Sequence, residues 1–168
     1  MKPRATAAAT TAPVHYLVEL LDVHAHLFRV TLTVPTPAAQ QVLRLPVWIP
    51  GSYLVREFAK HLQRLDARQG SKRVPVQQQD KATWEVTCTP GTPLQVQYEV
   101  YAFDASVRTA WLDAQRGFFN GTSLCLQVPE LADTPHTLAI AAEGAPKGWQ
   151  VATGLEAVKC DKAGSVSY

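Results

Sequence analysis

A two-residue alternation of apolar and polar side chains runs through much of the chain and limits the fold more than any other feature. Residues 26–34 place His26, Phe28, Val30, Leu32 and Val34 on one face, with Arg29, Thr31 and Thr33 on the other. Leu43, Leu45, Val47 and Ile49 alternate in the same way until Pro50 and Gly51. Successive side chains of a β-strand point to opposite faces, so this period indicates half-buried strands.

Turn-forming residues divide the chain into many short segments, roughly 8–12 residues apart. Further strands are predicted at 61–68, 73–79, 83–88, 94–103, 123–128, 136–142 and 149–153. This pattern predicts an all-β fold, an antiparallel β-sandwich or saddle-like sheet with one or two short helical turns. We expect one helical turn within 53–60, capped by Ser52, and another around 110–114 inside a loop.

The length of 168 residues fits one domain. Residues 1–13 are rich in Ala and Thr, and we predict a disordered tail there, followed by one β domain at 14–168. The net charge is +2 and the basic residues are scattered, which argues against nucleic-acid and membrane partners. Cys88, Cys125 and Cys160 are odd in number and widely spaced, so we expect free thiols and a cytoplasmic location.

The sequence offers little for catalysis. None of the five histidines belongs to a His-Glu-x-x-His motif, the arrangement that places two zinc ligands and a general base on one helix. His24 and His26 would share one face of a strand, but no third ligand accompanies them. Ser52 and Ser123 do not lie in a Gly-x-Ser-x-Gly motif, and Asn120-Gly121 is typical of a tight turn between strands. We therefore predict no metal site and no catalytic residue in this chain.

Two blocks, residues 47–53 and 116–123, combine aromatic residues with Pro, Gly and Asn, and such blocks mark sharp bends filled by aromatic rings. Between them lie Arg56-Glu-Phe58, Tyr101-Ala-Phe-Asp104 and Val107-Arg108. In this order, the motifs resemble the amino-terminal domain of the glycyl aminopeptidase family of zinc metallopeptidases. The resemblance extends from about Val14 to the end of the chain.

The resemblance implies a larger enzyme with a thermolysin-like zinc domain and a PDZ domain, which removes amino-terminal Gly or Ala from peptides. It implies no cofactor in this chain, zinc in the full-length enzyme, and no activity of the chain alone. The implied partners are the catalytic domain of the same parent chain and a peptide substrate. We also expect the isolated domain to expose an apolar face and to self-associate.

By analogy with related leukotriene-hydrolase and alanyl-aminopeptidase enzymes, the resemblance assigns substrate binding to the loop at 117–122. The residues expected to act there are Arg116, Phe119, Asn120 and Gly121, with Phe118 and Phe119 giving the loop its shape. We assign a structural role to Trp48, Pro50, Gly51, Tyr53, Arg56, Asp104 and Arg108. Trp48 and Tyr53 are expected to pack near the turn at Pro50-Gly51.

Two alternatives remain open from the residues alone. Arg108, Asp113 and Arg116 either form ion pairs that fix the loops or line a substrate groove. The chain is either part of an aminopeptidase or a stand-alone β-sandwich module that binds peptides or glycans on Trp111, Phe118 and Phe119. An adhesion-type domain is disfavoured by the odd number of cysteines.

Overall fold

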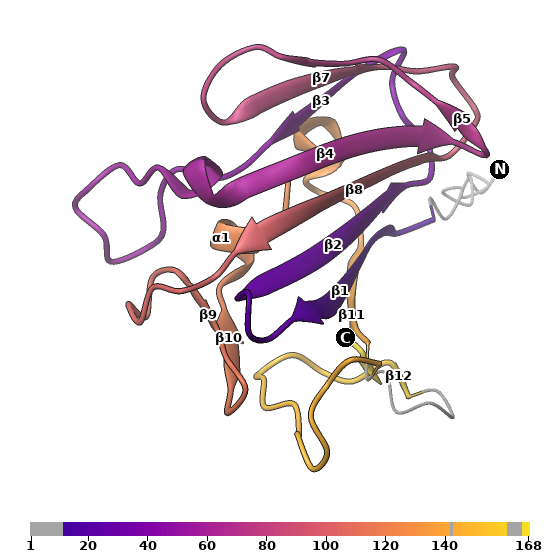
Figure 1. Ribbon diagram of the computed structural model, residues 1–168. Coiled ribbons are helices and arrows are strands. Elements are labelled where there is room, and N and C mark those ends of the chain that lie inside the picture. The colour runs from indigo at the N-terminus through magenta and orange to yellow at the C-terminus, as the bar shows by residue number, and fades with distance from the viewer. Residues whose placement is uncertain (1–11, 142, 161–165) are drawn as a thin grey trace, which may run out of the picture.

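A computed structural model describes residues 12–141, 143–160 and 166–168 (Figure 1). The predicted tail therefore lies almost entirely outside the described residues. The fold is mostly β, as predicted. Its main sheet has eight strands in the order β12-β13-β11-β1-β2-β8-β4-β5. Their bounds are Val14–Asp22 (β1), Leu27–Val34 (β2), Leu62–Gln69 (β4), Lys72–Arg73 (β5), Leu94–Tyr101 (β8), His136–Ile140 (β11), Lys159–Cys160 (β12) and Val166–Ser167 (β13).

A three-stranded sheet lies beside β4 in Figure 1, in the order β3-β7-β6. Its strands are Gln40–Arg44 (β3), Val76–Gln78 (β6) and Thr83–Thr87 (β7). Ala110–Leu112 (β9) and Gly117–Phe119 (β10) form a separate hairpin. The helical segments are short: Phe58–His61 (η1), Gly121–Leu124 (α1) and Pro129–Leu131 (η2). None of the described helices is long and apolar enough to cross a membrane.

The alternation determines which side chains enter the core. Phe28, Val30, Leu32 and Val34 of β2 are all buried, as predicted. Leu43 of β3 and Leu45, just after this strand, are also buried, and both sheets contribute to one hydrophobic cluster. The pairing is antiparallel except between β1 and β11, which run parallel. Parallel strands need a long crossover connection, and here residues 23–135 form the connection between β1 and β11.

Several predicted boundaries are wrong. The segment 110–119 forms the β9–β10 hairpin in place of a helical turn, and α1 replaces the start of the strand predicted at 123–128. Residues 149–153 have no strand partner, 73–79 is divided between β5 and β6, and the helical turn predicted within 53–60 is confined to 58–61. His26 lies in the β1–β2 turn with φ of 60°, so His24 and His26 do not share a strand face.

Candidate functional site

The two motif-rich blocks lie at the same end of the main sheet, where β8 ends and β2 and β4 begin (Figure 1). This end carries the loop 45–57, η1, the loop 102–109, the β9–β10 hairpin and α1, and we call it the motif end. Contacts between α1 and η1 join the second block to the segment that follows the first. Segments that are distant in sequence therefore form one surface.

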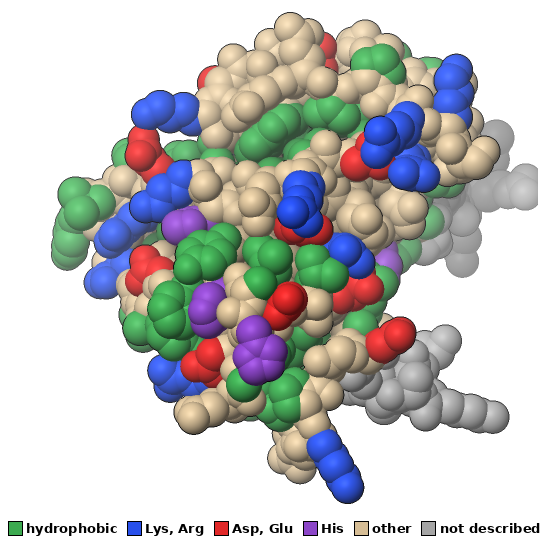
Figure 2. Space-filling view, viewed as in Figure 1, with side chains coloured by type: hydrophobic (Ala, Val, Ile, Leu, Met, Phe, Trp, Pro, Cys, Tyr) green, Lys and Arg blue, Asp and Glu red, His purple; other side chains and the backbone are tan. Residues whose placement is uncertain are grey.

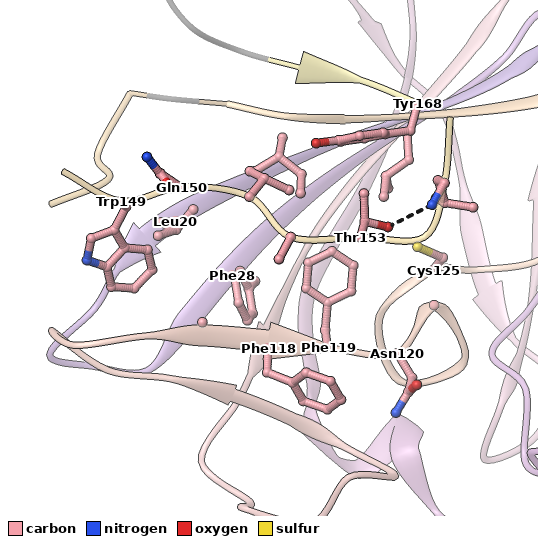
Figure 3. A pocket seen from close by; sticks show the side chains of 17 residues that line it. Leu20, Phe28, Phe118, Phe119, Asn120, Cys125, Trp149, Gln150, Thr153 and Tyr168 are labelled. Atoms are coloured by element: carbon pink, nitrogen blue, oxygen red, sulfur yellow. Dashed lines mark hydrogen bonds between the residues drawn. The ribbon is translucent and has the colours of Figure 1, made fainter. Parts of the chain in front are cut away.

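An apolar cavity of about 400 Å³ opens beside the β9–β10 hairpin. Its walls come from the main sheet, from β10 and from residues 149–155, which run across it (Figure 3). The side chains that line it are mainly Leu20, Phe28, Phe119, Leu138, Ile140, Trp149 and Leu155. A pocket of this size and polarity can receive an apolar side chain.

Three of the four residues expected to bind substrate lie at this cavity. Phe119 points into it and meets Phe28 edge-on, with ring centroids 5.5 Å apart. Phe118 points to the other side of β10, as Figure 3 shows, and Asn120 and Gly121 form one rim. Arg116 lies outside the cavity, with its guanidinium 5.7 Å from the Trp111 ring centre.

Asn120 is held by its own amide group. Its Nδ2 donates a hydrogen bond of 2.6 Å to the carbonyl oxygen of Val107, while its backbone oxygen accepts from Ser123 N–H at 3.0 Å. This places Asn120 immediately before α1, so the predicted tight turn between two strands is replaced by a strand-to-helix junction. Among the hydrogen bonds of the described residues, none uses Asn120 Oδ1, which leaves one fixed acceptor on an exposed loop.

Aromatic rings stack against the outer face of the hairpin. His26 stacks on Phe103 at 3.8 Å, and Phe103 stacks on Trp111 at 4.3 Å. The His26 ring also donates from Nδ1 to the Leu112 carbonyl oxygen at 2.5 Å, which ties the β1–β2 turn to β9. Trp111 is thus covered by Phe103 and Arg116. Phe119 points to the opposite side of β10 from Phe118. Trp111, Phe118 and Phe119 therefore do not form the continuous aromatic strip that a stacking platform for glycans or peptides needs.

The hairpin turn is built around Asp113. Its Oδ1 accepts from the backbone N–H groups of Gln115 and Arg116, and its Oδ2 accepts from Trp111 Nε1 at 2.8 Å. These hydrogen bonds, that from Arg116 N–H first, hold the pKa of the Asp113 carboxyl below its ordinary value. The Asp113 carboxylate therefore fixes this turn by accepting backbone N–H groups. Among the described residues, no ion pair joins Arg108, Asp113 and Arg116.

The residues given structural roles fix loops through local hydrogen bonds. Arg56 N–H donates to the Val47 carbonyl at 2.6 Å and closes the neck of the loop that contains Pro50 and Gly51. Gly51 has φ of 80°, a conformation that favours glycine at this turn. Asp104 accepts from Ser106 N–H and starts the next loop. Arg108 N–H donates to Ser106 Oγ in the same loop.

Trp48 and Tyr53 do not pack as predicted. Tyr53 is fully exposed and Trp48 is 52% exposed, with its Nε1 donating to the Ser52 carbonyl at 2.6 Å. The buried side chain of this block is Ser52, whose Oγ accepts from Leu54 N–H and Arg56 Nε. A small polar residue therefore holds the turn while the large rings face solvent.

Comparison with known proteins identifies the domain. A family model described as the Peptidase M61 N-terminal domain matches residues 15–168. The chain belongs to this family. An aminopeptidase N family protein from Idiomarina loihiensis shares 41% identity and a TM-score of 0.86, over 92% of this chain and 27% of that one. An M1 zinc metallopeptidase from Deinococcus radiodurans, bound to a Tyr-Ser-Ala substrate, shares 16% identity and a TM-score of 0.44, over 93% and 37% of the two chains. No curated protein matches the chain.

The M61 domain thus spans about a quarter of the Idiomarina loihiensis protein. A zinc ion does not fit the residues that the structure describes, because nowhere among them do three His, Cys, Asp or Glu side chains converge. His24 and His26 also have different partners. The backbone N–H of His24 donates to the Asp22 carboxylate, whereas Nδ1 of the His26 ring is bonded to the Leu112 carbonyl oxygen.

Two buried tyrosines that the sequence did not predict as functional position the site in the M61 domain. Tyr98 Oη donates to Leu124 O at 2.8 Å and accepts from Leu126 N–H at 3.0 Å, and Tyr16 Oη donates to Leu126 O at 2.7 Å. Burial raises the pKa of both phenols well above the ordinary value, so both stay protonated. The signal in the sequence was a tyrosine at a core-facing position of each strand, since a buried phenol requires a partner.

Proposed function

We propose that this chain is the non-catalytic amino-terminal β domain of a zinc aminopeptidase that removes Gly or Ala from peptide amino termini. In this proposal the domain forms one wall of the active-site cleft and helps to bind the free amino terminus of the substrate. The observation that carries the proposal is Asn120, an amide fixed at the rim of an apolar cavity with its acceptor oxygen available.

The chemistry of a peptide amino terminus matches this arrangement. An ammonium group carries only donors and must be met by acceptors. Because one N–H of Asn120 Nδ2 is bonded to the Val107 carbonyl, the orientation of the amide is fixed, and Oδ1 is the acceptor that it offers to the ammonium. Fixing the acceptor before binding lowers the entropy lost when the substrate binds.

The reaction itself is assigned to the remainder of the polypeptide. The relative from Idiomarina loihiensis has nearly three quarters of its length outside the matched region, which provides room for a separate peptidase domain. In our proposal that part holds the zinc ion, whose chemistry is activation of water. This chain contributes position and shape, through the hairpin, the cavity and the Asn120 loop.

Substitution of Asn120 by Ala in the full-length enzyme tests the proposal. Losing one hydrogen bond to a charged group costs about 1.5–3 kcal/mol, so kcat/KM for a peptide with a free amino terminus should fall about tenfold or more. Gln150→Ala is the matched control, because it removes an amide from the lining of the same cavity away from β10. Equal values of kcat/KM for Asn120→Ala and wild-type enzyme would remove Asn120 from the site.

A further inference from the structure

The loop between β3 and η1 contains the most exposed apolar segment of the motif end. Tyr53 is fully exposed, Val55 is 75% exposed and Leu54 is 63% exposed, and Trp48 lies half-exposed beside them. Figure 2 shows hydrophobic side chains on this protrusion at the left of the molecule, with Lys and Arg side chains next to them. Such a cluster on an exposed loop is typical of a surface that contacts another protein or domain.

The shape of this loop is set by its own hydrogen bonds. Arg56 N–H to Val47 O closes the neck, Ser52 N–H to Ile49 O forms the turn, and the Trp48 indole is bonded to Ser52 O. Several polar groups of the loop are thus paired within it, while the side chains of Tyr53, Leu54 and Val55 are exposed. A preformed apolar protrusion binds with less loss of conformational freedom than a flexible loop.

We infer that residues 47–55 dock into an apolar pocket of the remaining part of the same polypeptide, the part that carries peptidase activity. This inference rests on the proposed function and adds the surface by which the two parts meet. The Asn120 loop lies at the same end of the sheet, and α1 contacts η1, so docking through 47–55 would hold the Asn120 rim against that partner.

The size of the surface favours a partner in the same chain over a second copy. A fully covered aromatic side chain buries about 150–250 Å². Trp48 is already half-buried, and Leu54 and Val55 are smaller and only partly exposed, so with Tyr53 the four side chains offer less than about 800 Å². A stable complex of separate proteins needs about 800 Å² on each side. Covalent linkage raises the effective concentration to the millimolar range, which allows a smaller surface to stay bound.

The charged residues around the protrusion indicate which side chains should surround the complementary pocket of the partner. Arg56, Lys60 and Lys81 lie close to the protrusion, and Glu57 is the acidic residue among them, bonded to Lys81 at 2.7 Å. The surface is therefore an apolar centre beside a mainly basic rim. We expect Asp or Glu side chains around the complementary pocket.

Chymotrypsin tests the docking, because it cleaves after exposed Tyr and Leu side chains. The rate of cleavage at the Tyr53–Leu54 bond is measured by mass spectrometry in the full-length enzyme and in the 168-residue chain. Docking predicts at least a tenfold slower cleavage in the full-length enzyme. Equal rates would overturn the inference. Two further results would also overturn it: protection of the full-length enzyme that grows with its concentration indicates a second copy, and protection that requires added peptide indicates the substrate.

Matched variants separate docking from folding. In the full-length enzyme, Tyr53→Ser with Val55→Ser should lower the thermal midpoint by at least about 2 °C, and Val158→Ser, which alters a valine of similar exposure (72%), should not. In the 168-residue chain neither change should shift the midpoint. An unchanged midpoint of the full-length double variant would contradict docking. Because these readouts require no activity, they are independent of the Asn120→Ala result.

Discussion

Tyr98 joins the main sheet to the segment that carries the candidate site, and removing its hydroxyl tests that link. The hydroxyl donates to Leu124 O and accepts from Leu126 N–H, and all three residues are fully buried. The Tyr98→Phe substitution keeps the ring in the core. It therefore leaves one backbone carbonyl and one backbone amide without their partner.

The magnitude follows from these two groups. A buried polar group left unsatisfied costs about 1–3 kcal/mol, and partial relaxation of the 124–126 segment reduces the sum. We expect Tyr98→Phe to lower the free energy of unfolding by about 2–4 kcal/mol. For a chain of this size this corresponds to a thermal midpoint lower by about 4–16 °C. Urea unfolding of the 168-residue chain, followed by tryptophan fluorescence, measures the change directly.

Tyr16 provides the matched control for this experiment. Its hydroxyl makes a single bond, to Leu126 O, so Tyr16→Phe leaves one group unsatisfied and should cost about half as much. The comparison cancels effects common to losing a phenol from this core. A loss of stability in Tyr98→Phe no larger than in Tyr16→Phe would refute the two-bond account.

Two further predictions concern the backbone beside the cavity and the hairpin turn. Gly144 has φ of 83°, and an added Cβ would lie 2.8 Å from the Leu20 carbonyl oxygen. Gly144→Ala should therefore destabilise the chain by about 1–3 kcal/mol, and by more than Gly91→Ala, whose Cβ would meet nothing; equal losses in urea unfolding would contradict this reading. Asp113 has a lowered pKa, so its bonds to the turn are intact above about pH 4 and are lost as the pH falls through the lowered pKa. The amide resonance of Arg116 should titrate in that acidic range by NMR and should not titrate in Asp113→Asn.

The strands were predictable because burial on one face forces alternation. Phe28, Val30 and Leu32 show this without ambiguity, and the structure confirms them. The β9–β10 hairpin was missed because its strands are three residues long, too short for a period to register. Its turn depends on Asp113 accepting two backbone N–H groups, and a single Asp gives no pattern to detect.

The errors at Trp48 and Tyr53 have a different origin. Large aromatic residues predict burial, and the prediction placed that burial within this domain. The structure instead places Ser52 inside the loop and both rings outside, because three hydrogen bonds to Ser52 hold the turn without apolar packing. The position of the Asn120 loop was inferred from the family resemblance, and its side-chain geometry depends on contacts with residues 107 and 123 that no local pattern encodes.

The candidate site is held by anchors that come from three different parts of the chain. The His26 ring fixes β9 through Leu112, Tyr98 fixes the segment after α1, and the Asn120 amide fixes the loop at Val107. The three anchors act at different points of residues 110–126, at Leu112, at Asn120 and at Leu124 to Leu126, so a change at one anchor leaves the other two bonds in place. The orientation of Asn120 Oδ1 is therefore set within this domain, and a polar group held in place by the scaffold is positioned more precisely than one on a free loop.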